Sequence, residues 1–172
     1  MSHAQLGRIE RGELLQLTVD QASRACAAVG LRLAFRAYPD GDPVADRAQL
    51  ALLGRFRACL PEHARWLSEV PLPIQGDRRA WDAISIVAGF RFAVEAETRL
   101  RDIQALERRI ALKQRDSNIE VVVLVISDTF ANRRTLAIHR EALRARFPLG
   151  GRTILKALRA GRPPAASGVV VL

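Results

Sequence analysis

An uninterrupted apolar run, VVVLVI at residues 121–126, constrains the fold of this chain more than any other feature. Its six residues are far fewer than the roughly 20 that a membrane-spanning helix needs. A strand that is apolar at every position belongs instead in a sheet covered on both faces. The run therefore predicts a mixed α/β fold, an α/β or α+β sandwich, and no membrane partner.

Strands and helices are expected on both sides of this run. The sequence predicts strands at 81–87 and 90–97, which turn at Ala88-Gly89, and further strands at 120–126 and 168–172. It predicts helices at 46–59, 61–68, 99–115, 132–147 and 152–160. We interpret the pair Gly150-Gly151 as a joint between two helices.

The clearest linker is Pro39-Asp40-Gly41-Asp42-Pro43, because it combines turn formers with two prolines. Before it, capping residues and apolar spacing predict helices at 2–11 and 18–29, and alternation predicts a strand at 31–38. The predicted organisation is therefore an N-terminal region at 1–38, a linker at 39–45 and an α/β domain at 46–172.

Basic residues are concentrated at the end of the chain. Residues 1–128 carry 18 bases against 17 acids, whereas residues 129–172 carry nine against one. Such an excess favours a polyanion or an acidic protein surface, although a solvated charged face in an Arg-rich protein is the alternative. Few aromatic residues accompany it, so double-stranded DNA is a better candidate than a single strand. The tail residues that we expect to face DNA are Arg133, Arg134, Arg140, Arg144, Arg152 and Lys156.

Cysteine and histidine patterns give no sign of a metal or disulfide scaffold. Cys26 and Cys59 stand alone, and we expect both to be small buried hydrophobic residues. His3, His63 and His139 are scattered, so no zinc site is predicted. The first residues are charged and lack the apolar segment of a secretory signal, so we expect a soluble, cytoplasmic protein.

The first thirty residues carry a recognisable pattern. Ser2, Leu6, Ile9-Glu10-Arg11-Gly12, then Leu17-Thr18 and Ala27-Ala28-Val29-Gly30-Leu31, resemble the third and fourth helices of Cro/repressor-type (XRE) helix-turn-helix regulators. The resemblance implies that the first of these helices enters the major groove of DNA. It further implies DNA contacts from Ser2, His3, Gln5 and Arg8, with Gln5 able to bond adenine. The family domain has two earlier helices, so the resemblance also implies an N-terminally incomplete DNA-reading domain.

The middle of the chain resembles a second family. Asp82 lies on one expected strand, and Glu95-Ala96-Glu97 end the next one before a helix and the apolar strand. This order resembles the restriction-endonuclease-like (PD-(D/E)-x-K) superfamily, whose Asp and Glu bind Mg²⁺. The resemblance implies catalytic and metal-binding candidates at Asp82 and Glu95, with Glu97 as a further candidate.

One position departs from that nuclease pattern. Glu97 stands where the family has a lysine, and an acid cannot stabilise developing negative charge as a cation does. Arg99, Arg101 or Lys113 are candidates for the missing cation, and Glu62 or Glu69 for an upstream acid. Alternatively, the carboxylates pair with Arg91, Arg99 and Arg101 on a fold kept for binding. No cofactor is expected unless the nuclease interpretation holds, in which case it is Mg²⁺.

Three functions follow as hypotheses. The first is a DNA-binding transcriptional regulator, expected to form a homo-oligomer, whose C-terminal domain dimerises, senses a ligand or adds DNA affinity. The second is a Mg²⁺-dependent nuclease or a degenerate domain of that fold. The third is an antitoxin-like interaction factor whose basic tail binds an acidic protein partner.

Overall fold

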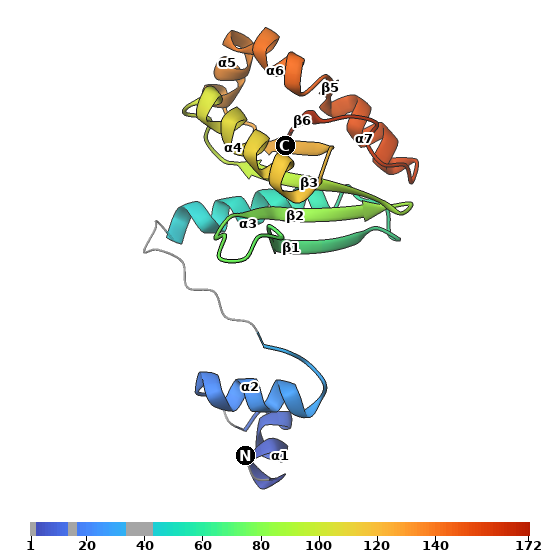
Figure 1. Cartoon of the computed structure of the whole chain (residues 1–172). Helices are drawn as coiled ribbons and strands as arrows, with labels where there is room; N and C mark the ends of the chain where they lie inside the picture. The colour runs from blue at the N-terminus through green and yellow to red at the C-terminus, as the bar shows by residue number, and fades with distance from the viewer. Residues whose placement is uncertain (1–2, 14–16, 34–42) are drawn as a thin grey trace. The chain divides into compact units, whose positions relative to one another are not determined.

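The computed structural model describes residues 3–13, 17–33 and 43–172. The chain divides into two units, Met1–Gly41 and Asp42–Leu172, here called the first and second units. Figure 1 shows both units, and each unit is described by itself. The linker expected at 39–45 lies largely outside the described residues, and the first helix of the second unit already begins within it, at Pro43.

Two helices make up the described part of the first unit, α1 (His3–Glu10) and α2 (Val19–Ala28). Thr18 caps α2 through a capping box, because its hydroxyl accepts the Gln21 N–H while the Gln21 side chain accepts the Thr18 N–H. Both helices are followed by a glycine with positive φ, Gly12 at 70° and Gly30 at 74°. The two helices expected here are therefore confirmed. Of the strand expected at 31–38, residues 31–33 are not extended in a sheet, and the rest lies outside the described residues.

The second unit is built around a mixed sheet in the order β1-β2-β3-β4-β6-β5. β1, β2 and β3 pair antiparallel, whereas β4 pairs parallel with β3 and β6, and β5 pairs parallel with β6. Its elements are α3 (Pro43–Arg57), β1 (Arg65–Pro71), β2 (Ala80–Val87), β3 (Phe90–Glu97), α4 (Ile103–Ser117), β4 (Val122–Ile126), α5 (Phe130–Ile138), α6 (Arg140–Arg146), β5 (Leu149–Gly150), α7 (Gly151–Arg159) and β6 (Gly168–Val171).

Helices cover both faces of this sheet. One face packs against α3 and α7, through residues such as Phe56 and Ile154. The other packs against α4 and α6, through residues such as Ile110 and Phe147. Every residue of β4 is buried between these two layers. The mixed α/β class that the apolar run predicts is therefore confirmed.

Some predicted elements are wrong. The helix expected at 61–68 is instead a turn followed by β1, which is one of the two edge strands of the sheet. The helix expected at 132–147 is divided into α5 and α6 at His139. Gly150-Gly151 joins β5 to α7 rather than two helices. Cys26 and Cys59 are each partly exposed rather than buried.

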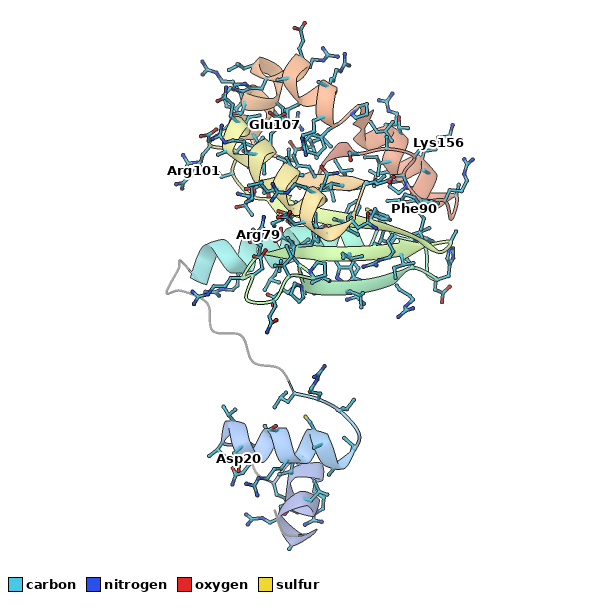
Figure 2. All side chains as sticks on the ribbon, in the orientation of Figure 1. Asp20, Arg79, Phe90, Arg101, Glu107 and Lys156 are labelled. Atoms are coloured by element: carbon cyan, nitrogen blue, oxygen red, sulfur yellow. The ribbon has the colours of Figure 1, made fainter. Side chains whose placement is uncertain are left out.

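The basic tail does not form one surface. Arg133, Arg134, Arg140 and Arg144 are exposed on α5 and α6, whereas Arg152 and Lys156 are exposed on α7. α6 and α7 lie on opposite faces of the sheet. Figure 2 shows Lys156 extending from α7. The charge that is continuous in sequence is therefore split in space. Among the described residues, no helix has the length and apolar character of a membrane span.

Candidate active site

Strands β2 and β3 separate at Asp82, where the sequence places its first candidate carboxylate. Their paired register ends at Ala83 and Val94. Just beyond it, the Asp82 carboxylate accepts the backbone N–H of Ala96 at 2.8 Å. A side chain thus takes the place of a backbone acceptor at the end of the ladder. This geometry fixes the Asp82 carboxylate against the residue that follows Glu95.

Gln49 of α3 reaches the same point from the other layer. Its Nε2 donates to Asp82 Oδ2 at 2.9 Å and lies 3.3 Å from the Ala96 carbonyl oxygen. Two oxygens therefore converge on one amide nitrogen. Gln49 was not among the predicted site residues, although its spacing places it on the same helix face as the buried residues Leu52 and Phe56.

Glu95 and Lys113 form a buried ion pair between β3 and α4. Lys113 Nζ lies 2.7 Å from Glu95 Oε1, and the two side chains are only 8% and 2% exposed. The ammonium also lies 5.3 Å from the ring centroid of Trp81, within cation–π range. The backbone N–H of Asp82 donates to the same Glu95 oxygen at 3.4 Å. Lys113 is therefore the candidate cation that the fold brings to the carboxylates.

Burial is the largest influence on the pKa of the Glu95 carboxyl. Removing the carboxylate from water raises its pKa to about 7, and repulsion from Asp82 adds to this, while Lys113 opposes it. A carboxyl of this kind changes charge near neutral pH. Its ionisation can therefore be coupled to chemistry at the site.

Glu97 pairs with Arg109 rather than joining the first pair. Two strand residues span about 6.6 Å and four helix residues about 6 Å, so acids two apart on β3 match bases four apart on α4. Burial raises the pKa of the Glu97 carboxyl, and the Arg109 guanidinium opposes that rise. Glu97 therefore acts as the anion of a second ion pair and does not occupy the role of the family's lysine.

An arginine-lined pocket of about 340 Å³ lies beside Glu97. The loop at 98–102 and the first turns of α4 form its walls, with Arg99, Arg101 and Arg109 among the lining residues. Arg91 is exposed on β3 and does not line this pocket. The structure thus brings Arg99 and Arg101 near Glu97, but Lys113 is the cation bonded to Glu95.

Asn132 of α5 holds the loop at 98–102 in place through hydrogen bonds. It is fully buried, and its Oδ1 accepts the Leu100 N–H at 2.9 Å. Its Nδ2 donates to the carbonyls of Thr98 at 3.0 Å and Ser127 at 2.9 Å. One side chain therefore satisfies three backbone groups on the loop and at the end of β4. Asn132 was not among the predicted site residues.

Oxygen atoms of Asp82, Glu95 and Ala96 lie near the strand separation, and each residue already accepts a hydrogen bond there. Asp82 and Glu95 offer carboxylates, and the Ala96 carbonyl faces the same nitrogen as Asp82. Oxygen donors of this kind are those that Mg²⁺ prefers. Among the described residues, no group of three or more His, Cys, Asp or Glu side chains is arranged to hold a metal ion. A cation here would therefore need the backbone carbonyl or water as a third ligand.

The candidate DNA-reading residues lie in the first unit. Arg8 is exposed and its Nε lies 3.9 Å from a Glu13 carboxylate oxygen, a weak surface contact. Leu6 and Ile9 are half-buried. Ser2 and the side chains of His3 and Gln5 lie outside the described residues. No protein-family model, curated protein or solved structure matches this chain.

Proposed function

We propose that the second unit is a Mg²⁺-dependent nuclease that cleaves double-stranded DNA in the cytoplasm. The observation that carries this proposal is the 2.7 Å contact between Lys113 and Glu95, beside Asp82. The nuclease pattern lacks its lysine on β3. A lysine from the facing helix supplies a cation next to the same carboxylate.

The side chains of the cluster have separable chemical roles. The side chains of Asp82 and Glu95 would supply oxygen ligands for a divalent cation, and the Lys113 ammonium would stabilise negative charge that develops on the phosphoryl oxygens. Arg99 and Arg101, exposed beside Glu97, attract the DNA backbone. Bound Mg²⁺ would polarise the phosphodiester and lower the pKa of a water molecule.

Cleavage of supercoiled plasmid in the presence of Mg²⁺ tests the proposal. The full chain should nick or linearise the plasmid, and EDTA should stop the reaction. Asp82→Asn retains an acceptor for the Ala96 N–H, so it removes the charge while keeping the fold. We expect Asp82→Asn and Glu95→Gln each to lower the rate by about a hundredfold or more.

Glu141→Gln on α6 is the matched control, because Glu141 is an exposed carboxylate on another helix. It should cut like the wild type. Equal cleavage by the wild type and Asp82→Asn would identify a contaminating nuclease and contradict the proposal. Salt-dependent DNA binding without any cleavage would mean that the fold binds DNA but does not cut it.

The first unit supports a second candidate function, sequence-specific DNA binding by a transcriptional regulator. The observation in its favour is the pair α1 and α2, with the capping box at Thr18 and left-handed glycines at 12 and 30. These are the features on which the resemblance to helix-turn-helix regulators depends.

Selection of bound sequences from a random duplex library tests this second function. The wild type should enrich one motif, and its affinity should fall steeply with salt. Gln5→Ala should relax the preference at one base position, whereas Arg24→Ala, an exposed arginine on α2, should leave the motif unchanged. An unchanged motif in Gln5→Ala would show that α1 does not read the bases.

A further inference from the structure

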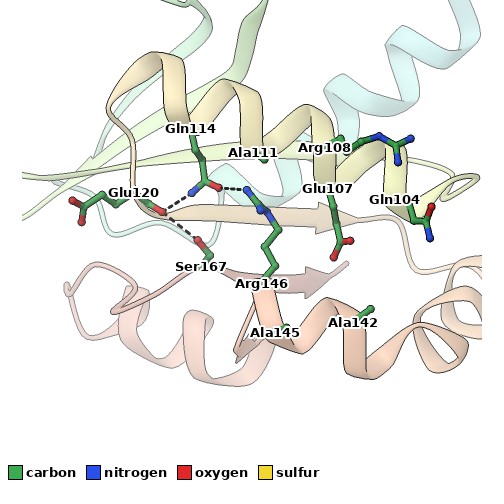
Figure 3. A pocket seen from close by; sticks show the side chains of 10 residues that line it. All are labelled: Gln104, Glu107, Arg108, Ala111, Gln114, Glu120, Ala142, Ala145, Arg146 and Ser167. Carbon is green, nitrogen blue, oxygen red and sulfur yellow. Dashed lines mark hydrogen bonds between the residues drawn. The ribbon is translucent and has the colours of Figure 1, made fainter.

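A groove of about 770 Å³ lies between α4 and α6, apart from the carboxylate cluster. Figure 3 shows it from close by. One stripe of α4 forms its first wall, and a facing stripe of α6 forms the second. Alanines at 111, 142 and 145 line it, and their small side chains leave the space between the helices open. A volume of this size is typical of small-molecule sites.

Arg146 provides an unsatisfied donor in this groove. Its Nη2 donates to Gln114 Oε1 at 2.6 Å, but its Nε is buried and has no hydrogen-bond partner. Buried donors of a charged group are rarely left unpaired, because the loss of solvation is not offset. The guanidinium of Arg146, which lines the groove, is therefore not fully satisfied within the chain, and a guanidinium favours an oxyanion as its partner.

Glu107 provides the opposite charge. It is partly buried, lines the same groove and has no hydrogen bond or ion pair among the described residues. Figure 3 shows Glu107 and Arg146 extending into the groove from opposite helices. Glu107 and Gln114, the partner of Arg146, are seven residues apart on α4, about 10 Å along the axis. The groove thus presents an acceptor for an N–H group at one end and a donor for an oxyanion at the other.

We propose that this groove binds a small molecule with an oxyanion at one end and an N–H donor about 10 Å away, a nucleoside monophosphate being the class that fits. The phosphate accepts from Arg146, the base amine donates to Glu107, and the ring system lies against the alanines. Such a site adds ligand binding to the proposed DNA functions and does not depend on either of them.

Calorimetric titration of the full chain tests the site with three probes. Adenosine 5′-monophosphate carries both end groups, ribose 5-phosphate carries only the phosphate, and adenosine only the amine. In the wild type, the monophosphate should bind about tenfold more tightly than either fragment, as expected for one additional charged hydrogen bond. Equal binding of the monophosphate and of either fragment would overturn the proposal, as would no binding at all.

Variants assign each end of the ligand. Arg146→Met should reduce monophosphate affinity to that of adenosine, and Glu107→Gln should reduce it toward that of ribose 5-phosphate. Arg146→Lys keeps the charge but lacks the planar guanidinium, so it too should lose about tenfold. Arg144→Met and Glu141→Gln, exposed positions on α6 outside the groove, are matched controls. Wild-type affinity in both Arg146 variants would place the ligand elsewhere and overturn the proposal.

Discussion

The Lys113 ammonium and the Glu95 carboxylate contact each other at 2.7 Å, and both side chains are almost fully buried. A buried charge without its partner is costly, whereas a neutral replacement of the whole pair is often tolerated. The contact therefore makes each residue depend on the other. It also means that the cation beside the candidate catalytic carboxylates is held in place by the packing of α4 on β3.

Removing one member of this pair should destabilise the protein more than removing both charges. We expect Lys113→Met to lower the free energy of unfolding by about 3 kcal/mol, because Glu95 then remains buried and unpaired. The double variant Lys113→Met/Glu95→Gln should recover part of this loss. Urea unfolding of the four proteins measures the coupling, expected to be about 2 kcal/mol. Simple additivity would show that the contact contributes nothing.

The raised pKa of Glu95 predicts how the free energy of unfolding changes with pH. Its pKa in the folded protein, about 7, lies above its ordinary value of 4.5, so the folded state binds the proton more tightly. The resulting stabilisation is full below pH 4.5 and is lost as pH rises to 7. Relative to Glu95→Gln, the wild type should lose about 3 kcal/mol across this interval. Urea unfolding at several pH values measures it, and parallel curves for the two proteins would contradict it.

Asn132 should control the arginine-bearing loop. Asn132→Ala removes the partners of the Leu100 N–H and of the Thr98 carbonyl, whereas the Ser127 carbonyl keeps the Thr129 N–H, so we expect a loss of about 3 kcal/mol in the free energy of unfolding. Amide exchange at Leu100 should accelerate more than global unfolding explains. Arg134→Ala, an exposed position on the same helix, should change neither quantity. Unaltered exchange at Leu100 in Asn132→Ala would show that other contacts hold the loop.

Two glycines offer a matched test of packing. A Cβ at Gly168 would lie 2.3 Å from the Leu149 carbonyl oxygen, a backbone atom that cannot move freely, whereas a Cβ at Gly150 would meet nothing within 4 Å. Gly168→Ala should therefore destabilise the protein by about 3 kcal/mol. Gly150→Ala should change stability by less than about 0.5 kcal/mol. Thermal unfolding of both variants compares them, and equal stability would mean that β5 is easily displaced.

Patterns of period two and apolar runs predicted β2, β3, β4 and β6, and β3 and β4 are buried strands bounded by clear turns, whereas the two edge strands, β1 and β5, were not predicted. β1 was missed because its half-buried residues, Trp66 and Val70, are four apart, a spacing that a helix produces as readily as an edge strand. The break between α5 and α6 was missed because His139 carries no glycine or proline signal.

The candidate site was predictable only in part. Asp82 and Glu95 were candidates through the resemblance to the nuclease superfamily, and Lys113 was one of three candidate cations. Choosing among those cations required knowing which face of α4 packs on the sheet. Only Lys113 lies on the buried face that includes Ile103 and Ile110. Gln49 is neutral and distant in sequence, so no charge pattern marked it. Contacts between the helices and the sheet determine which side chains reach the site, and the spacing of residues in the sequence does not predict those contacts.

Because Asp82 accepts the Ala96 N–H, it has a structural role in the sheet in addition to its proposed catalytic role. The Asp82 carboxylate completes the hydrogen bonding between β2 and β3, so a substitution that removes this acceptor also disturbs the end of the two strands. Inactive variants at this position would therefore be ambiguous between lost chemistry and a frayed strand end. Only an amide of the same shape separates the two, which makes asparagine the informative substitution at this residue and alanine the misleading one.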